Sequence, residues 1–348
     1  MMLSIISLRQ LAAGALTLTL MACQSATTTK TTATAGNSAV GYIEIYDQRA
    51  LEFIDSKRPA EVLAGNFEWT EGPLWVEDGN YLLFSDIPRN MVMKYKPDSA
   101  ELSVYLDNSG WTENTELSGY GSNGLLLNEQ GELVLMQTGQ RQVAVMDAPL
   151  DSPKPNYRSL AARHHGKRFN SPNDAVFHSN GDLYFTDPGH GLNPADGRVS
   201  ELGYSGVYRI DTNGELLLLD DSLSFPNGIA LSRDEKTLYV AVSDADKPAW
   251  YAFDVQQDGR LANKRLLHDA KPYLKDGEHH GLPDGMVLHS SGVLFATGPG
   301  GVWLFDEQGK VLARVFTGQL TSNAELNADE SMLYLTADDY LMQLPLNK

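Results

Sequence analysis

Residues 168–188, RFNSPNDAVFHSNGDLYFTDP, contain the pattern that determines the fold. A polar turn with Asn173 leads into a short apolar run, a turn follows at residues 178–182, and a second apolar run ends at Asp187. Short apolar runs bounded by Asn, Asp, Gly and Pro are typical of strands joined by tight turns. The stretch therefore predicts two antiparallel strands, with a carboxamide at the start of the first.

The same pattern recurs along the whole chain. Its copies are anchored at Glu71, Asn123, Asn173, Asn227, Asp284 and Asn323. A period of about 40–50 residues with four strands per unit is typical of radial β-repeats, in which each unit packs only against its neighbours. Six copies predict an all-β protein, a six-bladed β-propeller. A pair of β-sandwiches is the alternative, but sandwiches rarely repeat one motif so regularly. Because the last copy is short, we expect the N-terminal strand region, residues 42–63, to complete the last blade.

The first 23 residues have the features of a targeting segment. One basic residue, Arg9, precedes an apolar run over residues 11–22 that is too short to span a membrane as a mature helix. The run ends in LMAC, which resembles a bacterial lipobox, with Cys23 as the residue that becomes lipidated. Cys23 is the only cysteine, so an intramolecular disulfide is excluded. Residues 1–23 are therefore interpreted as a lipoprotein signal segment, with plain secretion or a chance cysteine as the alternative.

The rest of the chain divides into a linker and a folded domain. Residues 24–39 are rich in Thr, Ala and Ser, which is typical of a flexible tether, and residues 40–348 carry the repeats. We expect an exported lipoprotein anchored by Cys23 on the periplasmic side of a membrane. Gln24 after the cysteine favours the outer membrane.

The charge balance excludes one class of partner. The formal net charge is −18, and no cluster of Lys and Arg residues interrupts the acidic sequence. Nucleic-acid binding requires basic side chains that displace counterions from phosphates, so we expect no nucleic-acid partner. An acidic balance is compatible with a site that binds a cation.

One residue in each copy lies just before the strand that would be innermost in a propeller. Innermost strands line the central channel with equivalent ends at the same opening, so the six anchor residues should converge. Glu71 and Asp284 are carboxylates and the other four are carboxamides, and all are oxygen donors suited to a hard cation. The alternative is that these residues only form Asx-turns before glycine. For Asn123 and Asn323, the main alternatives to direct metal binding are a role in a turn and support of a neighbouring ligand.

Four motifs resemble those of a known family. EGPLW at residues 71–75, SPND at 171–174, FPNGI at 225–229 and LPDGM at 282–286 are similar to blade motifs of the SMP-30/gluconolactonase/LRE-like family, and they occur in the same order. The resemblance covers about residues 67–340. It implies a six-bladed propeller with one catalytic divalent cation, with calcium expected and zinc, magnesium or manganese as alternatives. The ligands that it implies are Glu71, Asn173, Asn227 and Asp284.

The resemblance also implies an activity, the opening of a sugar-derived lactone. The metal would polarise the carbonyl and Asp284 would activate water, although a nucleophilic aspartate, as in related phosphotriesterases, is also open. The expected substrate contacts are Asn173, Arg168, Tyr120 and His280. For His190, His279 and His280 a structural or surface role is the alternative.

Two other functions remain open at this point. The same metal could serve a lactonase, esterase or phosphotriesterase for non-sugar substrates, or the domain could be a tethered binding propeller with a structural cation. The chain has no Gly-x-Ser-x-Gly motif, so nothing indicates a serine hydrolase. A small-molecule lactone is the expected substrate.

Overall fold

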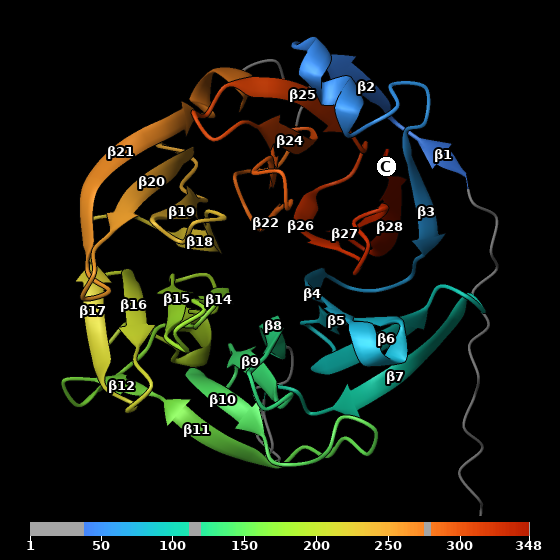
Figure 1. The fold of residues 1–348 in the computed structure, drawn as a ribbon. Coiled ribbons are helices and arrows are strands. Elements are labelled where there is room, and N and C mark those ends of the chain that lie inside the picture. The colour runs from blue at the N-terminus through green and yellow to red at the C-terminus, as the bar shows by residue number, and fades with distance from the viewer. Residues whose placement is uncertain (1–37, 111–119, 275–279, 348) are drawn as a thin grey trace, which may run out of the picture. The chain divides into compact units, whose positions relative to one another are not determined.

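The computed structural model describes residues 38–110, 120–274 and 280–347. These residues form six antiparallel sheets arranged as blades around one axis (Figure 1). Among them the only helices are short 3-10 turns, and none is long and apolar enough to cross a membrane. The all-β class and the six-bladed propeller are confirmed. The predicted signal segment and all but the last two residues of the tether lie outside the described residues.

Four blades are built from strands that follow one another along the chain. Blade 1 contains β4 (Thr70–Val76), β5 (Tyr81–Asp86), β6 (Met91–Lys96) and β7 (Glu101–Asp107). Blade 2 contains β8 (Ser122–Leu127), β9 (Leu133–Gln137), β10 (Gln142–Met146) and β11 (Tyr157–Ala161). Blade 3 contains β14 (Ala175–Phe177), β15 (Leu183–Asp187), β16 (Gly206–Ile210) and β17 (Leu216–Asp220). Blade 4 contains β18 (Pro226–Leu231), β19 (Thr237–Val242), β20 (Ala249–Val255) and β21 (Leu261–Asp269).

Blades 5 and 6 combine strands from both ends of the chain. Blade 5 contains β22 (Met286–Leu288), β23 (Leu294–Gly298), β24 (Gly301–Phe305), β25 (Val311–Phe316) and, on its outer edge, β2 (Tyr42–Ile45). Blade 6 contains β26 (Thr321–Leu326), β27 (Met332–Ala337), β28 (Tyr340–Pro345), β3 (Ala60–Ala64) and β1 (Ala39–Val40). Figure 1 shows these blue N-terminal strands beside the red C-terminal ones.

The ring is closed as expected by a strand from the N-terminal region. β3 pairs antiparallel with β28, with Val62 opposite Met342. The earlier strand β2 takes a different place from the one expected, because β3 already occupies the edge of β28. It covers the edge of β25 instead and so protects an otherwise exposed edge of blade 5.

Packing between blades buries their middle strands on both faces. All five residues of β9 and of β24 are buried, for example, so these strands read as continuous apolar runs. Trp250 of blade 4 and Trp303 of blade 5 are fully buried, with ring centroids 5.5 Å apart. Each such side chain contributes about 1.5–3 kcal/mol when it is removed from water. The six inner strands in turn each contact the next, and β26 contacts β4.

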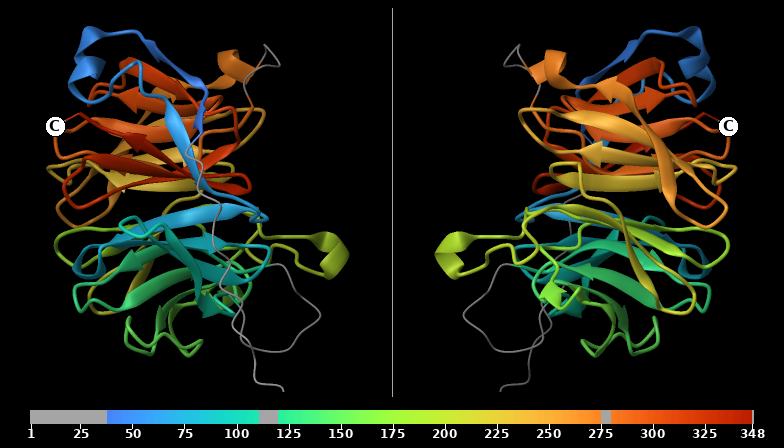
Figure 2. Two further views of the ribbon diagram at one scale, coloured as in Figure 1. Left: turned by 90° about the vertical axis from the view of Figure 1, so that its right-hand side faces the viewer. Right: turned by 90° about the vertical axis from the view of Figure 1, so that its left-hand side faces the viewer.

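A repeated hydrogen bond fixes the inner ends of neighbouring blades. Ser85 Oγ, at the end of a second strand, donates to the Asn123 carbonyl oxygen of the next blade at 2.8 Å. Thr186 Oγ1 donates in the same way to the carbonyl oxygen of Asn227 at 2.7 Å. These bonds hold the anchor residues at constant positions around the axis. Seen from the side, the loop that carries η3 (Pro194–Asp196) projects from one face of the ring (Figure 2).

Candidate active site

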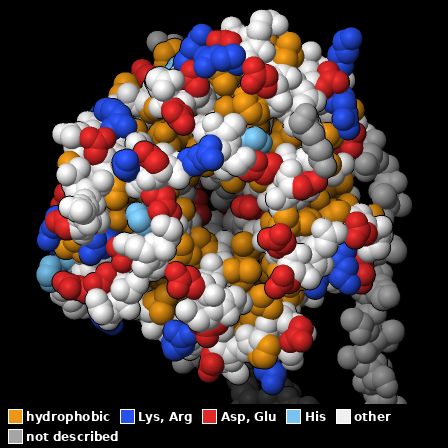
Figure 3. All heavy atoms as spheres, viewed as in Figure 1, with side chains coloured by type: hydrophobic (Ala, Val, Ile, Leu, Met, Phe, Trp, Pro, Cys, Tyr) orange, Lys and Arg blue, Asp and Glu red, His pale blue; other side chains and the backbone are white. Residues whose placement is uncertain are grey.

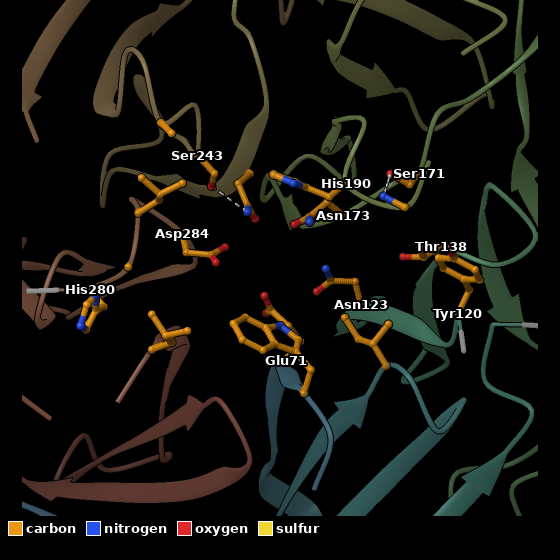
Figure 4. A pocket seen from close by; sticks show the side chains of 18 of the residues that line it. Glu71, Tyr120, Asn123, Thr138, Ser171, Asn173, His190, Ser243, His280 and Asp284 are labelled. Carbon is orange, nitrogen blue, oxygen red and sulfur yellow. Dashed lines mark hydrogen bonds between the residues drawn. The ribbon is translucent and has the colours of Figure 1, made fainter. Parts of the chain in front are cut away.

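The beginnings of the inner strands meet in a cavity of about 680 Å³. It is lined by five of the six anchor residues, namely Glu71, Asn123, Asn173, Asn227 and Asp284. Figure 4 shows Glu71, Asn123, Asn173 and Asp284 pointing toward one another from different blades. Side chains separated by up to about two hundred residues in sequence are therefore brought into one cavity.

Local irregularity in the inner strands turns these side chains toward the axis. The pairing of β4 with β5 shifts register between Glu71 and Leu74, and that of β18 with β19 shifts between Pro226 and Ile229. Bulges of this kind are common beside functional sites, because they re-aim a side chain.

The glycine after an anchor residue has a packing role of its own. A Cβ atom on Gly228 would lie 2.2 Å from the carbonyl oxygen of Asp284, and one on Gly72 would lie 2.1 Å from that of Asn123. Glycine is therefore required so that neighbouring blades can approach closely. The recurrent Asn-Gly pattern thus reflects blade packing as well as turn formation.

The two carboxyl groups point toward each other, with Glu71 buried and Asp284 half-buried. Glu71 is 3 % exposed, and its Oε2 accepts hydrogen bonds from Gly72 N at 3.1 Å and Asn323 Nδ2 at 3.4 Å. Asp284 Oδ1 is buried and has no hydrogen-bond partner among the described residues. Burial raises the pKa of Glu71 to about 8. Burial, followed by the charges of Glu71 and Asp174, raises the pKa of Asp284 well above its usual range. Such a pair is unfavourable when ionised unless a cation compensates the charge.

Hydrogen bonds orient one of the carboxamides. Asn227 Nδ2 donates to Ser243 Oγ at 2.9 Å, and Ser243 Oγ donates to the carbonyl oxygen of Pro283 at 2.6 Å. Because the amide nitrogen of Asn227 is committed to Ser243, its oxygen is the group left to face the cavity. The same serine also holds the backbone directly before Asp284.

The two weaker anchor residues have different surroundings. Asn323 Oδ1 accepts from the backbone N–H of Ala324, and its Nδ2 donates to Glu71. Asn123 Oδ1 is buried and without a hydrogen-bond partner within the described residues. Asn323 therefore supports a carboxylate, whereas Asn123 presents an uncompensated oxygen to the cavity.

This donor set fits a hard divalent cation. Carboxylate and carboxamide oxygens are the ligands that calcium prefers, and Oδ1 of Asp284 and of Asn123 has no hydrogen-bond partner within residues 38–110, 120–274 and 280–347. No group of three His, Cys, Asp or Glu side chains suited to a metal occurs in the described parts of the chain. An imidazole- or thiolate-rich centre is therefore not formed there, and a cation would depend on the carboxamides.

The walls of the cavity include three further predicted residues. Tyr120 and His280 line it on opposite sides, and His190 lines it beside Asn173 (Figure 4). The His190 ring packs 4.9 Å from that of Phe225. Its side chain is reached by solvent within the cavity, but the surrounding protein lowers its pKa to about 4. His190 is therefore neutral at pH 7.

An arginine fixes the wall that carries Tyr120. The Arg198 guanidinium lies 4.4 Å from the centre of the Tyr120 ring, and Tyr120 Oη donates to Asp196 at 3.2 Å. Arg198 also donates to the carbonyl oxygens of Gly191 at 2.7 Å and Thr138 at 2.6 Å. The projecting η3 loop is thereby tied to blade 2 at the rim of the cavity.

The structure does not bring Arg168 together with the other expected contacts. It lies in β13 (Lys167–Arg168), which pairs with β12 (Arg163–His164) in a small separate hairpin. Its backbone N–H donates to Glu201, and its guanidinium to the Gln140 carbonyl oxygen at 3.4 Å. It is not among the described residues that line the cavity. His279 lies outside the described residues.

Sequence reasoning missed Ser243 and Trp69, which also line the cavity. A signal for Ser243 was present, because a serine or threonine ends the second strand in several copies, as at Ser85, Thr186 and Thr297. Trp69 lines the cavity because of its position in the propeller, and no repeated sequence pattern marks it.

The sequence and the fold are similar to those of known proteins. The model of the SMP-30/gluconolactonase/LRE-like region matches residues 69–338. The chain is 36 % identical to a gluconolactonase of Zymomonas mobilis over 88 % of this chain and 86 % of that protein. It is 25 % identical to a pentonolactonase of Haloferax volcanii over 76 % of this chain and 80 % of that protein. A solved gluconolactonase from Xanthomonas campestris is similar with a TM-score of 0.76 and 28 % identity, over 90 % of this chain and 99 % of the other.

Proposed function

The chain belongs to the SMP-30/gluconolactonase/LRE-like family, and from this membership we propose that it is a hydrolase that opens a sugar-derived lactone with the help of one divalent cation. Two similar proteins that cover most of the chain are a gluconolactonase and a pentonolactonase, which supports a sugar lactone as substrate. The observation that carries the proposal is the unpaired buried oxygen of Asp284 beside Glu71 and the carboxamides.

The residues that would hold the cation are Glu71, Asn173, Asn227 and Asp284. Calcium is the proposed ion because all four donors are oxygens and two of them are neutral. When bound, the cation supplies Lewis-acid polarisation of the lactone carbonyl and stabilises the developing oxyanion. Asn123, with its free oxygen at the same cavity, is a further candidate for the donor set.

Asp284 would accept the proton of the attacking water. The water oxygen forms a bond to the carbonyl carbon, the bond to the ring oxygen breaks, and the proton held on Asp284 passes to that oxygen to give the aldonic acid. Its place in the cavity supports this role, because its Oδ1 has no hydrogen-bond partner among the described residues and is free to accept a proton. A single turnover in ¹⁸O water separates this role from a nucleophilic one: label incorporated into Asp284 would show covalent catalysis.

The walls would orient the sugar hydroxyls. Asn173, Tyr120 and His280 present amide, phenol and imidazole groups to the cavity from different sides. Because Arg168 is held in its own hairpin, it is not included in this proposal.

The test is lactone hydrolysis before and after chelation. Purified protein is treated with EDTA, and D-glucono-1,5-lactone, an acyl-homoserine lactone and a phosphotriester are assayed with and without Ca²⁺, Mg²⁺, Mn²⁺ or Zn²⁺. We expect gluconolactone to be the best substrate, its hydrolysis to be lost with EDTA, and Ca²⁺ to restore it. A protein that is thermally stabilised by metal but turns over none of the three substrates would instead be a binding propeller with a structural cation.

We also propose that Cys23 carries a lipid and places the domain on the periplasmic side of a membrane. The lipobox-like sequence before Cys23 supports this. Labelled palmitate should be incorporated into the wild-type protein and not into Cys23→Ser, and equal labelling of both would exclude lipidation at this residue.

A further inference from the structure

A second cavity, of about 500 Å³, adjoins the one that holds the carboxylates. We refer to it as the outer lobe, and its lining side chains are Tyr42, His280, Phe316, Gln319, Leu320 and Asp338. His280 and Leu320 also line the first cavity. The outer lobe therefore lies directly beside the first cavity, on the other side of His280 and Leu320.

An exposed aromatic ring forms one side of the outer lobe. Tyr42 is 50 % exposed, and its ring is stacked on Phe316 with centroids 4.3 Å apart and planes 15° apart. The two residues are directly paired in the β2–β25 ladder. One face of Tyr42 is thus covered and fixed, and the other is open. A rigid, half-open aromatic ring suits the apolar C–H face of a sugar ring, since it gives contact area at low entropic cost.

The opposite walls are also held by hydrogen bonds. The Thr317 and Thr321 hydroxyls are 2.7 Å apart, and Gln319 N donates to Thr317 Oγ1 at 3.3 Å. The shared wall is anchored where Gly300 N donates to the carbonyl oxygen of His280 at 2.8 Å. The shape of the lobe is therefore preorganised.

Polar side chains complete the lining. Gln319 and Asp338 place an amide and a carboxylate in the same lobe as the Tyr42 ring. An aromatic face with a few polar groups is the composition that a small-molecule site requires. For a sugar, the aromatic face takes the C–H surface and the polar groups take the hydroxyls at the ring edge.

The outer lobe is built partly by residues outside the family match. Tyr42 precedes residue 69, where the match begins, and reaches the cleft through the β2 strand. A lactone with a single ring needs only the first cavity, where the carboxylates lie. The lobe is thus a feature by which this chain can recognise a larger substrate.

We propose that the outer lobe binds the second sugar ring of an aldobionolactone, a sugar lactone that carries another sugar in glycosidic linkage. The inference rests on the proposed lactonase function and specifies its substrate class. In a 1,5-lactone the position opposite the carbonyl is C4, so a sugar linked there points away from Asp284 when the carbonyl faces the carboxylates. Tyr42 would stack on this sugar, and Gln319 and Asp338 would bind its hydroxyls.

The test compares two lactones in four proteins. The probes are D-glucono-1,5-lactone and cellobiono-1,5-lactone, in which glucose is linked to O4. The proteins are wild type, Tyr42→Ala, Tyr42→Phe and Tyr46→Ala. Tyr46 is 51 % exposed on the same N-terminal segment but does not line either cavity, so it is a matched control.

We expect wild type to have a higher kcat/KM for cellobionolactone than for gluconolactone. Tyr42→Ala should lower kcat/KM for cellobionolactone by about five- to tenfold, which is the range of one aromatic contact. Gluconolactone hydrolysis should change less than about twofold and so report that the variant is folded. Tyr42→Phe and Tyr46→Ala should behave like wild type with both lactones.

The inference would be overturned if Tyr42→Ala hydrolysed cellobionolactone as fast as wild type does. The lactonase function would remain intact in that case, provided that gluconolactone is hydrolysed. An equal loss for both lactones in Tyr42→Ala would also overturn the inference, because the effect would then be structural. If neither lactone is hydrolysed by wild type, the proposed function fails and the inference fails with it.

Discussion

The two ends of the propeller axis are built from the same six inner strands but have opposite chemistry. At one end the strand beginnings place two carboxylates and three carboxamides in a cavity. At the other end a cavity of about 440 Å³ is lined mostly by aliphatic side chains, among them Leu74, Leu126 and Val176, together with Asp174 and Glu325. The blades follow one another clockwise in Figure 1 and anticlockwise in Figure 4, so these two figures view opposite ends of the axis. Figure 3 has the view of Figure 1 and therefore shows this second end, as a central hollow with hydrophobic and acidic side chains at its border.

A buried carboxylate with a raised pKa occurs at both ends, so this property alone does not identify the active site. Burial raises the pKa of Asp174 to about 7 and that of Glu325 to about 8. Both oxygens of Asp174, however, accept backbone N–H groups, from Ala175 at 2.9 Å and Ile229 at 3.4 Å. Asp284 differs because its Oδ1 has no partner within the described residues and faces carboxamides. Within the described residues, the active-site end is distinguished by buried side-chain oxygens without a hydrogen-bond partner, those of Asp284 and Asn123, and not by a raised pKa.

The largest expected difference between the ends is in catalysis. Asp284→Asn should reduce lactone kcat/KM by about 10³-fold, because it removes both the proton acceptor and a charged donor. Glu325→Gln makes the same chemical change at the other end and should leave kcat/KM within about threefold of wild type. Steady-state hydrolysis of gluconolactone at saturating Ca²⁺ measures both. Comparable losses in the two variants would show that the ends are functionally coupled and would remove the distinction drawn above.

The same substitution should have the opposite effect on stability. In EDTA at neutral pH, Asp284→Asn should raise the melting temperature, because it removes a carboxyl group whose raised pKa reflects a cost to the folded state that no cation then compensates. Differential scanning calorimetry with and without Ca²⁺ reports this, and wild type should gain more from Ca²⁺ than the variant. A lower melting temperature of the variant in EDTA would mean that Asp284 has a stabilising partner.

Ser243→Ala tests the hydrogen bonds that orient Asn227 and the backbone before Asp284, and its expected effect is smaller. Loss of the hydroxyl frees the Asn227 amide and the Pro283 carbonyl oxygen, so calcium affinity should fall by about 10- to 100-fold. Ser85→Ala is the matched control, since Ser85 makes the corresponding bond between blades but bonds no carboxamide side chain. Calcium titration by calorimetry measures the affinities. If the two variants lose affinity equally, blade packing, and not orientation of Asn227, sets the metal affinity.

The smallest expected effect is on pH dependence at the aliphatic end. Because the pKa of Glu325 is about 8 in the folded protein and near 4.5 in the unfolded chain, the folded state binds its proton more tightly. The free energy of unfolding should therefore fall as pH rises from about 5 to 8.5. Glu325→Gln should remove part of this fall, on the order of 1 kcal/mol, since solvent in the cavity screens the charge. Urea unfolding in EDTA at about pH 5 and about pH 8.5 measures the free energy of unfolding of both proteins. If it falls by the same amount between the two pH values in wild type and in Glu325→Gln, the assignment to Glu325 is contradicted.

The sequence predicted the features that repeat and missed those that arise from a single contact between distant segments. The six anchor residues could be identified because each occupies the same place in a copy, and ring closure then brings five of them into one cavity. The narrower set of four ligands came from the family resemblance and not from the repeat. Arg168 could not be placed by this reasoning, because it lies in an insertion between blades 2 and 3 where no periodicity applies.

Other features depend on side-chain pairing that no local pattern records. The unpaired oxygen of Asp284 and the different roles of Asn123 and Asn323 follow from which neighbours hydrogen-bond to them. The attachment of β2 to blade 5 follows from competition with β3 for one edge. Three-dimensional packing decides these outcomes. Sequence reasoning could therefore name the anchor residues and the N-terminal strand region, but not their hydrogen-bond partners or the blade that β2 joins.

The pairing of β3 with β28 has a consequence for how the molecule is made. Residues 60–64 can pair only when residues 340–345 are present, so blade 6 cannot be completed before almost the whole repeat region is available to fold. Pairings between such distant residues also form slowly. During that interval the flank of blade 1 that later contacts β26 is uncovered, which makes the newly made protein a substrate for chaperones and sensitive to any loss of its last strand.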